Sequence, residues 1–271
     1  MAGKVSLVGA GPGDPELLTI RALRLLQSAD VVLHDDLIGA QILEIASKTA
    51  HIRSVGKRCG RKKIRQDEIN ALLISYASFG LRVVRLKSGD PLLFGRAGEE
   101  IEALRKAQVD FEIVPGVTSA SAAGAALGAP LTQRNKASAV VFLTSHQAAD
   151  RSTQWTTYLH SGATLAIYMP GADHAGTSAS LVGAGIPLET PCAIVSQAST
   201  KDQRIHRTTV YGLPGAPPLP APTILLVGEV FRIEETQAHR TSDRVMPVLH
   251  EPVFASPKFD VFADNQVVWG D

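Results

Sequence analysis

Two glycine-rich turns, each containing the tripeptide Gly-Asp-Pro, mark the places where this sequence could bring its backbone close to a ligand. The first turn is at 13–15, after the predicted strand 4–9, and the second is at 89–91, after the predicted strand 81–86. Open α/β sheets bind ligands where their strands end, and glycine allows a close approach to the backbone. The two turns therefore predict one crevice formed by two strand ends.

The first turn resembles a dinucleotide-binding fingerprint but differs from it in chemistry. A third glycine is expected where this chain has Asp14, and Pro12 has no backbone N–H to offer a phosphate. A carboxylate at this position would repel a pyrophosphate. We expect Asp14 to cap a helix over 15–28 instead, with Pro15 at its first position, and the ligand to be something other than a diphosphate.

Two other carboxylates follow predicted strands. Asp90 is either an ordinary turn aspartate or a ligand contact at a strand end. Asp35, in the run His34-Asp35-Asp36, is either a loop carboxylate or a base that faces the crevice. Spacing alone leaves both pairs of alternatives open.

A basic cluster at 57–65 holds six Lys or Arg side chains in nine positions, in a chain whose net charge is only +1. Such runs are usually solvated surface, but here the local field favours an anionic partner. No aromatic residue is interleaved for base stacking, so a polycarboxylate or phosphate is favoured over nucleic acid. The candidate carboxylate anchors are Arg58, Arg61, Arg96 and Arg134.

The remaining composition is that of an ordinary globular chain, with 45% hydrophobic and 20% charged residues in 271. Cys59 and Cys192 have no metal-type spacing, and the histidines form no metal pattern. No signal peptide precedes the first strand and no apolar run is long enough to span a bilayer. We expect a cytoplasmic protein without a metal, a membrane or a nucleic acid partner.

Strand and helix patterns alternate over the first 130 residues, which predicts a mostly parallel sheet covered by helices. Strands dominate the second half, which predicts a mixed sheet. The expected domains are an N-terminal α/β lobe (1–130), a C-terminal α/β lobe (131–235) and an irregular extension (236–271). The predicted strands are 4–9, 31–35, 51–55, 81–86, 111–114, 139–144, 164–169, 192–196, 204–209 and 223–227. The predicted helices after 15–28 are 39–47, 66–79, 96–107, 118–127, 153–160 and 173–184.

Several motifs, taken together and in this order, resemble the tetrapyrrole methylases. They are Val-Gly-Ala-Gly-Pro-Gly-Asp-Pro at 8–15, Val-Gly-Lys-Arg-Cys-Gly at 55–60, Gln-Asp-Glu-Ile-Asn at 66–70, Lys-Ser-Gly-Asp-Pro-Leu-Leu-Phe-Gly-Arg at 87–96 and Val-Pro-Gly-Val-Thr-Ser-Ala-Ser at 114–121. The match extends from about residue 4 to about residue 233. The second and third motifs are most similar to the members that methylate uroporphyrinogen III.

The resemblance implies a two-lobed α/β fold that binds S-adenosyl-L-methionine, usually as a homodimer. It implies two successive C-methylations of uroporphyrinogen III, through a mono-methylated intermediate, to precorrin-2 for sirohaem or cobalamin biosynthesis. S-adenosyl-L-homocysteine is then the second product.

By motif position, the resemblance also assigns site residues. Asp35 matches a proton acceptor and Lys57 a proton donor, while Arg96 and Arg134 would face substrate carboxylates. The implied cofactor contacts are Pro12, Ser88, Gly89, Asp90, Leu93, Thr118, Ser119, Met169 and Ala198.

Three alternatives stay open at this point. The chain could methylate another precorrin, or it could bind a tetrapyrrole or the cofactor without catalysis, because Ser88 stands where the family usually has glycine. A nicotinamide oxidoreductase is the weakest alternative, because Pro12 and Asp14 disfavour a diphosphate.

Overall fold

The computed structural model describes residues 3–56, 64–145 and 162–233. The described residues up to Arg232 belong to one compact unit, which holds the two sheets and the site described below. The predicted helix 153–160 lies outside the described residues, as do Cys59 and the expected extension 236–271.

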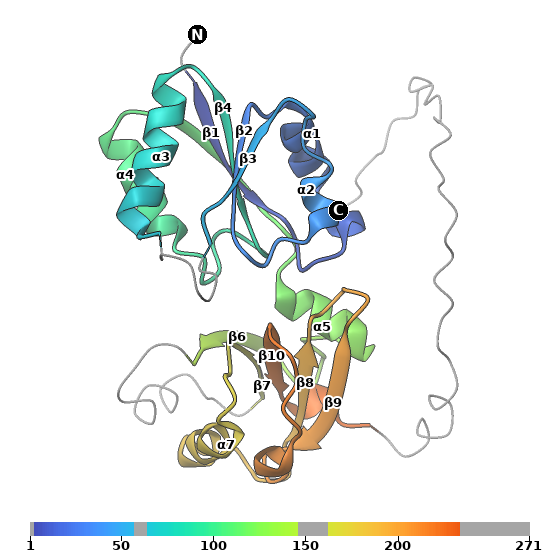
Figure 1. The fold of residues 1–271 in the computed structure, drawn as a ribbon. Coiled ribbons are helices and arrows are strands. Elements are labelled where there is room, and N and C mark those ends of the chain that lie inside the picture. Colours follow the sequence, from blue (N-terminus) through green and yellow to red (C-terminus); the bar gives the residue numbers. More distant parts are fainter. Residues whose placement is uncertain (1–2, 57–63, 146–161, 234–271) are drawn as a thin grey trace, which may run out of the picture. The chain divides into compact units, whose positions relative to one another are not determined.

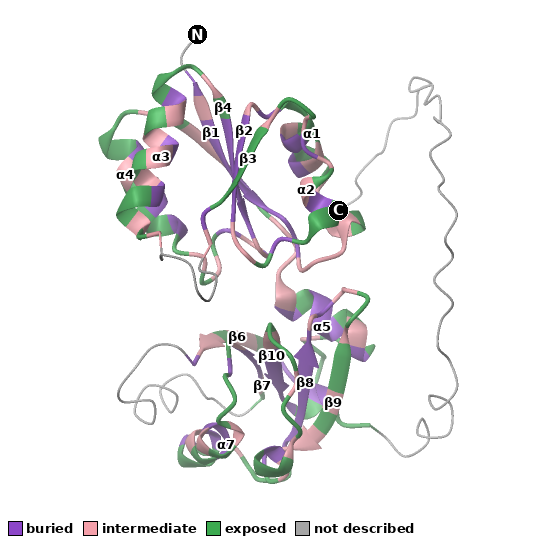
Figure 2. Ribbon diagram, in the orientation of Figure 1, coloured by how far each residue is buried: buried purple, intermediate pink, exposed green. Residues whose placement is uncertain are grey.

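The first sheet consists of five parallel strands in the order β3-β2-β4-β1-β5. Its strands are β1 (Lys4–Gly9), β2 (Val31–His34), β3 (His51–Ser54), β4 (Arg82–Lys87) and β5 (Asp110–Val114). Helices α1 (Ile20–Ser28) and α2 (Ala40–Leu43) cover one face, and α3 (Gln66–Ser78) and α4 (Ala97–Lys106) cover the other (Figure 1). The central strands are therefore buried on both faces (Figure 2).

The second sheet is mixed and has the order β6-β7-β10-β8-β9. Its strands are β6 (Ala139–Thr144), β7 (Ala163–Tyr168), β8 (Pro191–Ser196), β9 (Arg204–Thr209) and β10 (Thr223–Val227). β6 and β7 are parallel, while β10 is antiparallel to both of its neighbours and β9 is antiparallel to β8. The α/β class, with one mostly parallel and one mixed sheet, is confirmed.

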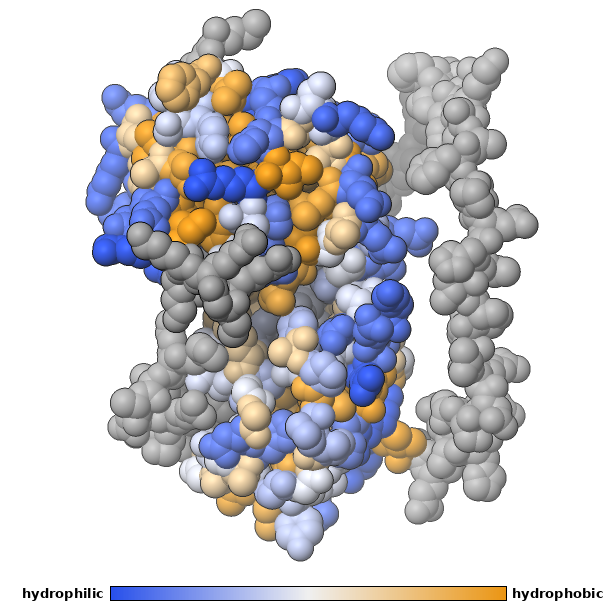
Figure 3. Space-filling view, in the orientation of Figure 1, coloured by the Kyte–Doolittle hydropathy of each residue, from blue (hydrophilic) through white to orange (hydrophobic). Residues whose placement is uncertain are grey.

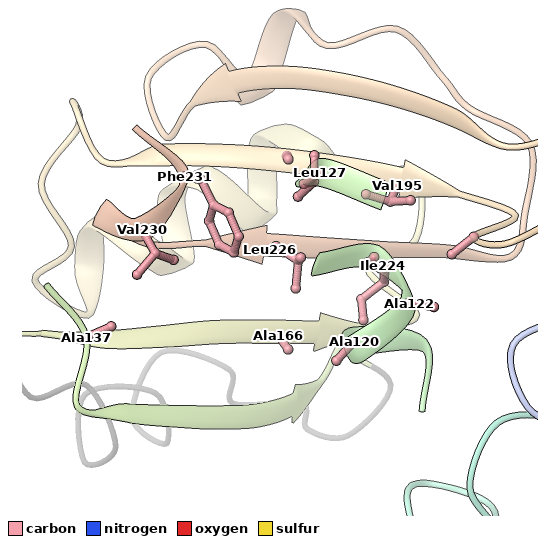
Figure 4. Packing of buried hydrophobic residues seen from close by; sticks show 13 residues of the cluster. Ala120, Ala122, Leu127, Ala137, Ala166, Val195, Ile224, Leu226, Val230 and Phe231 are labelled. Carbon is pink, nitrogen blue, oxygen red and sulfur yellow. The ribbon is translucent and has the colours of Figure 1, made fainter. Parts of the chain in front are cut away.

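Small side chains let α5 (Ser119–Leu127) lie close to this sheet. Ala120, Ala122 and Ala123 are buried against a core that includes Ala166 of β7 and Leu226 of β10 (Figure 4). On the other face, α7 (His174–Gly183) packs through its buried leucine into a second cluster. Because α5 is held tightly, its first residues have a defined position beside the strand ends.

The first and last residues of every predicted strand lie within one position of those of an observed strand. The single helix predicted over 15–28 is wrong, because the chain forms a 3₁₀ helix, η1 (Pro15–Leu17), and then the separate helix α1. Asp14 caps only η1, through Oδ1, which accepts a hydrogen bond from Glu16 N at 2.9 Å. Thr19 is the N-cap of α1, and its Oγ1 accepts from Ala22 N at 3.1 Å.

The face in Figure 3 mixes hydrophilic and hydrophobic side chains. Of the helices that the structure describes, none combines the length and apolar character that a membrane span needs.

Candidate functional site

Three glycines at the ends of neighbouring strands pack backbone against backbone. A Cβ added at Gly9 would lie 2.6 Å from Gly116 N and 2.7 Å from Gly89 O. The two glycine-rich turns are joined by Gly11, whose N–H donates to Gly89 O at 3.2 Å and whose carbonyl accepts from Gly89 N at 2.8 Å. Gly89 has a left-handed φ of 66°, which favours glycine there. The ends of β1, β4 and β5 therefore form one tightly packed platform.

The carboxylate of Asp90 holds this platform together. Its Oδ1 accepts from Leu92 N at 2.8 Å, within its own loop, and its Oδ2 accepts from Gly116 N at 3.0 Å. Asp90 also lines the cavity described next. Asp90 is therefore a turn aspartate that also lines the cavity, and its contact with a ligand stays a prediction.

A cavity of about 200 Å³ opens above the platform and is lined by elements of both sheets. Its lining includes all nine residues predicted to contact a cofactor, and also Asp35. The other lining residues are Leu37, Phe94, Gly95, Tyr168, Val195, Pro222, Thr223 and Ile224. Residues that lie far apart in the sequence are thus brought to one site.

Tyr168, at the end of β7, organises one wall of this cavity. Its hydroxyl is hydrogen-bonded to Thr118 Oγ1 and lies 3.4 Å from Ala120 N, which donates to it. The ring is tilted against that of Phe94, with 5.0 Å between centroids. Burial raises the pKa of the Tyr168 hydroxyl, so this group remains a neutral hydrogen-bonding partner at physiological pH.

Backbone strain is concentrated around the cavity. Phe94 and Met169 line it with left-handed φ values of 54° and 51°. Gln197 and Ser199, with φ of 50° and 63°, flank the lining residue Ala198. For residues other than glycine, such a backbone conformation costs about 1–3 kcal/mol and tends to occur at functional sites.

Asp35 connects this cavity to a second one of about 350 Å³. Its side chain, 32% exposed, forms an ion pair with Arg85 of β4. Arg85 also lines the second cavity, as does Arg96. A carboxylate and an arginine predicted for substrate handling therefore share one cavity next to the cofactor candidates.

The predicted anchors Arg96 and Arg134 have different surroundings. Arg96 precedes α4 in a left-handed conformation and is clamped by Glu99 through two hydrogen bonds of 2.7 Å. Arg134 is exposed in a turn and is not among the residues that line these cavities. The predicted residues Lys57, Arg58 and Arg61 lie outside the described residues.

Sequence reasoning missed the buried ion pairs beneath Asp35. Arg85 and Lys87 are charged residues in a strand with otherwise apolar buried positions, and both bind Glu100 of α4. This interruption of an apolar run was a signal in the sequence. Sequence reasoning also missed Tyr168 and Phe94, because an aromatic side chain is as typical of the core as it is of a site.

The lining side chains of the first cavity have a one-sided chemistry. The lining residues include Asp35 and Asp90 and, as far as the structure describes them, no Lys, Arg or His. Asp35 is paired with Arg85 and both oxygens of Asp90 accept from backbone N–H groups, so the lining offers a diphosphate no basic side chain. Among the described residues, no cluster of three His, Cys, Asp or Glu side chains could hold a metal ion.

Residues 4–214 match the protein family described as tetrapyrrole (corrin/porphyrin) methylases. The chain belongs to the tetrapyrrole methylases. The matched range includes the glycine platform, Asp35 and every residue that lines the first cavity except Pro222, Thr223 and Ile224. It therefore connects the family directly to the site described above.

Two similar proteins have names that state an enzymatic function. A uroporphyrinogen-III C-methyltransferase of Paracoccus denitrificans is 45% identical, over 86% of this chain and 83% of its own length. A siroheme synthase of Methylococcus capsulatus is 43% identical, over 87% of this chain and 51% of its own length. This chain therefore spans about half the length of the siroheme synthase that it matches.

A solved structure with the same fold is described as a complex with a ligand. The uroporphyrin-III C-methyl transferase of Thermus thermophilus, complexed with S-adenyl homocysteine, is 35% identical and has a TM-score of 0.74. The alignment covers 85% of this chain and 94% of that one.

Proposed function

We propose that this chain is an S-adenosyl-L-methionine-dependent methyltransferase that converts uroporphyrinogen III to precorrin-2 by two successive C-methylations. The observation that carries the proposal is the first cavity, whose lining gathers the nine predicted cofactor residues, together with Asp35, and contains no basic residue among those described. The names of the Paracoccus and Thermus relatives support the same substrate and cofactor.

The cavity fits the proposed cofactor by its chemistry. S-adenosyl-L-methionine, when bound, supplies a methyl group on a positively charged sulfur for in-line displacement. The lining has no basic side chain to repel that positive charge, and Leu93, Phe94 and Met169 offer apolar surface to the ligand. Gly89 is buried but lines the cavity, and its missing side chain leaves room for a ligand, because an added Cβ there would meet no protein atom nearer than 3.9 Å.

The chain's own residues chiefly align the two reactants, which can account for a large part of the rate. A reduced pyrrole carbon is already electron-rich and needs no activated protein nucleophile. Methyl transfer from the sulfonium leaves the ring cationic, and loss of one proton to Asp35, which we assign as the acceptor, restores its charge. Lys57 keeps the proton-donor role that its motif position implies, in a step separate from this one. Arg58, Arg61, Arg96 and Arg134 would bind the substrate's carboxylates.

We further propose that the chain acts as a homodimer in the cytoplasm and that its product enters sirohaem or cobalamin biosynthesis. It divides into lobes 1–130 and 131–235 and an extension 236–271. S-adenosyl-L-homocysteine is released after each transfer, and no metal takes part.

Transfer of labelled methyl groups tests the proposal. With uroporphyrinogen III and methyl-labelled S-adenosyl-L-methionine, the wild-type chain should give a labelled tetrapyrrole. Asp35→Asn should bind S-adenosyl-L-homocysteine normally in calorimetry but turn over about 10²–10⁴-fold more slowly. The matched control is Asp110→Asn, which removes an exposed carboxylate at the start of β5 and should change neither quantity.

The other outcomes identify the alternatives. Label in a later precorrin but none in uroporphyrinogen III would assign the chain to another methylation step. Binding of S-adenosyl-L-homocysteine without any labelled product would indicate a non-catalytic member of the family.

A further inference from the structure

Four charged side chains of alternating sign form a continuous chain beneath the site. Asp35 contacts Arg85, Arg85 contacts Glu100, and Glu100 contacts Lys87. The side chains of Arg85, Glu100 and Lys87 are only 3%, 0% and 2% exposed, whereas that of Asp35 is 32% exposed. Only the carboxylate at the end of the chain therefore reaches the cavities to a substantial degree.

The guanidinium of Arg85 is fixed on several sides. Its Nε donates to Glu100 Oε1 at 2.9 Å, and its Nη1 faces the carbonyls of Leu33 at 3.4 Å and Leu86 at 3.2 Å. Its Nη2 donates to Asp35 Oδ1. With four hydrogen bonds inside the protein, this arginine is built to hold a neighbouring group rather than to capture a ligand.

Glu100 is held equally firmly from the other side. Lys87 Nζ donates to its Oε2 at 2.9 Å, and Gln66 Nε2 donates to its Oε1 at 3.3 Å. Glu100 lines neither the first nor the second cavity. Two of its partners, Arg85 and Gln66, do line the second cavity, and of these two Arg85 is the one that also binds Asp35.

Joining two strands does not require buried ions. At the opposite end of the same two strands, Arg82 of β4 binds Asp30, which directly precedes β2, and the Arg82 side chain is 63% exposed. Buried ion pairs are costly to desolvate and often add little stability. The buried version at the site end therefore calls for a role other than stability.

We infer that Arg85 is a positioning residue that fixes the Asp35 carboxylate at the junction of the two cavities, and that Glu100 holds Arg85 in place for this purpose. The inference rests on the proposed function only for the role of Asp35 in turnover. The position of Asp35 itself is a structural matter that can be measured without any substrate.

Arg85→Lys is the variant that separates position from charge. It keeps a cation beside Glu100 but lacks the planar fork that binds Glu100 and Asp35 together. A misplaced reacting group costs about 10²-fold in rate. We expect kcat to fall about 100-fold, while KM and the Kd for S-adenosyl-L-homocysteine stay within about threefold of the wild type. The matched control, Arg82→Gln, breaks the other Arg–Asp pair and should leave kcat unchanged.

A double variant tests whether Arg85 acts through Asp35. If it does, Asp35→Asn and Asp35→Asn/Arg85→Lys should have the same kcat within about twofold, because removal of the carboxylate removes what Arg85 positions. Losses that multiply in the double variant would overturn the inference, as would an unchanged kcat in Arg85→Lys.

A crystal structure of Arg85→Lys gives an answer independent of activity. The Asp35 carboxylate should leave its wild-type position, and an unmoved carboxylate would overturn the inference. If the wild type methylates no tetrapyrrole, the proposed function fails, while this structure still decides the role of Arg85.

Discussion

Replacement of Gly9 by alanine tests whether the glycine platform holds the cavity in shape. Gly9 has no left-handed φ, so alanine is free to adopt its backbone conformation. The new Cβ would lie 2.6 Å from Gly116 N and 2.7 Å from Gly89 O, and these are backbone atoms that cannot rotate away. To reach ordinary contact at 3.4 Å, the strand end must move about 0.8 Å from Gly116 N and about 0.7 Å from Gly89 O.

The cost of this separation has two parts. Overpacking of this kind costs about 1–3 kcal/mol in the free energy of unfolding. A shift of this size in the Gly89 loop should also weaken the binding of S-adenosyl-L-homocysteine. We expect its Kd to rise about tenfold, which is a loss of about 1.4 kcal/mol in binding free energy. Urea unfolding and calorimetry measure the two quantities separately.

The chain offers a matched control in Gly98 of α4. An added Cβ there meets nothing within 4 Å, so Gly98→Ala should be neutral or stabilise by about 0.5–1 kcal/mol through helix propensity, without any effect on binding. If Gly9→Ala unfolded and bound like this control, the argument that backbone packing of glycines shapes the site would be refuted.

Three further predictions concern single side chains. Tyr168→Phe keeps the ring but deprives the start of α5 of its hydroxyl partner, so unfolding should become about 1–2 kcal/mol easier in urea titrations; no loss would mean that this hydrogen bond adds nothing. Glu100→Gln leaves Lys87 buried without its counter-charge and should cost about 3–5 kcal/mol at pH 7. Burial, and then repulsion by a neighbouring arginine, already lower the pKa of Lys87, and this loss of the counter-charge lowers it further. The unfolded chain then binds the proton more strongly than the folded one, so the stability of Glu100→Gln should rise with pH from 7 towards 10, by at most about 1.4 kcal/mol per pH unit; a flat profile would contradict the assignment. Hydrogen bonds from Arg82 lower the pKa of Asp30 to about 2. The wild type should therefore be more stable than Arg82→Gln above about pH 4, and this difference should vanish as the pH falls to 2 in acid-unfolding curves.

The inner strands could be predicted from the sequence because their short, mostly apolar runs are buried on both faces and are bounded by glycine, proline or polar turns. They are β1, β2, β4, β7, β8 and β10. The helix after the first turn could not be predicted correctly by the same reasoning. Asp14 and Thr19 are both good N-caps, and sequence periodicity does not reveal that the chain uses both and becomes extended between them at Leu18. Local signals compete there, and tertiary packing decides.

The site shows the same division. The glycine turns and Asp90 could be located because strand ends of a parallel sheet meet at one edge. Arg85 could be noticed as a charge within an apolar strand, but its partner Glu100 lies on α4, and only the folded chain brings the two together. The reading of the first turn as unsuited to a diphosphate agrees with a cavity that has carboxylates and no described basic side chain in its lining.

The central claim is that this chain places two methyl groups on uroporphyrinogen III. Mass spectrometry of the tetrapyrrole recovered after incubation with uroporphyrinogen III and deuteromethyl-labelled S-adenosyl-L-methionine tests it most directly. The account predicts a product that carries two labelled methyl groups, preceded at early times by a species with one. Unmodified uroporphyrinogen III, recovered from a chain that binds S-adenosyl-L-homocysteine in the same buffer, would contradict it.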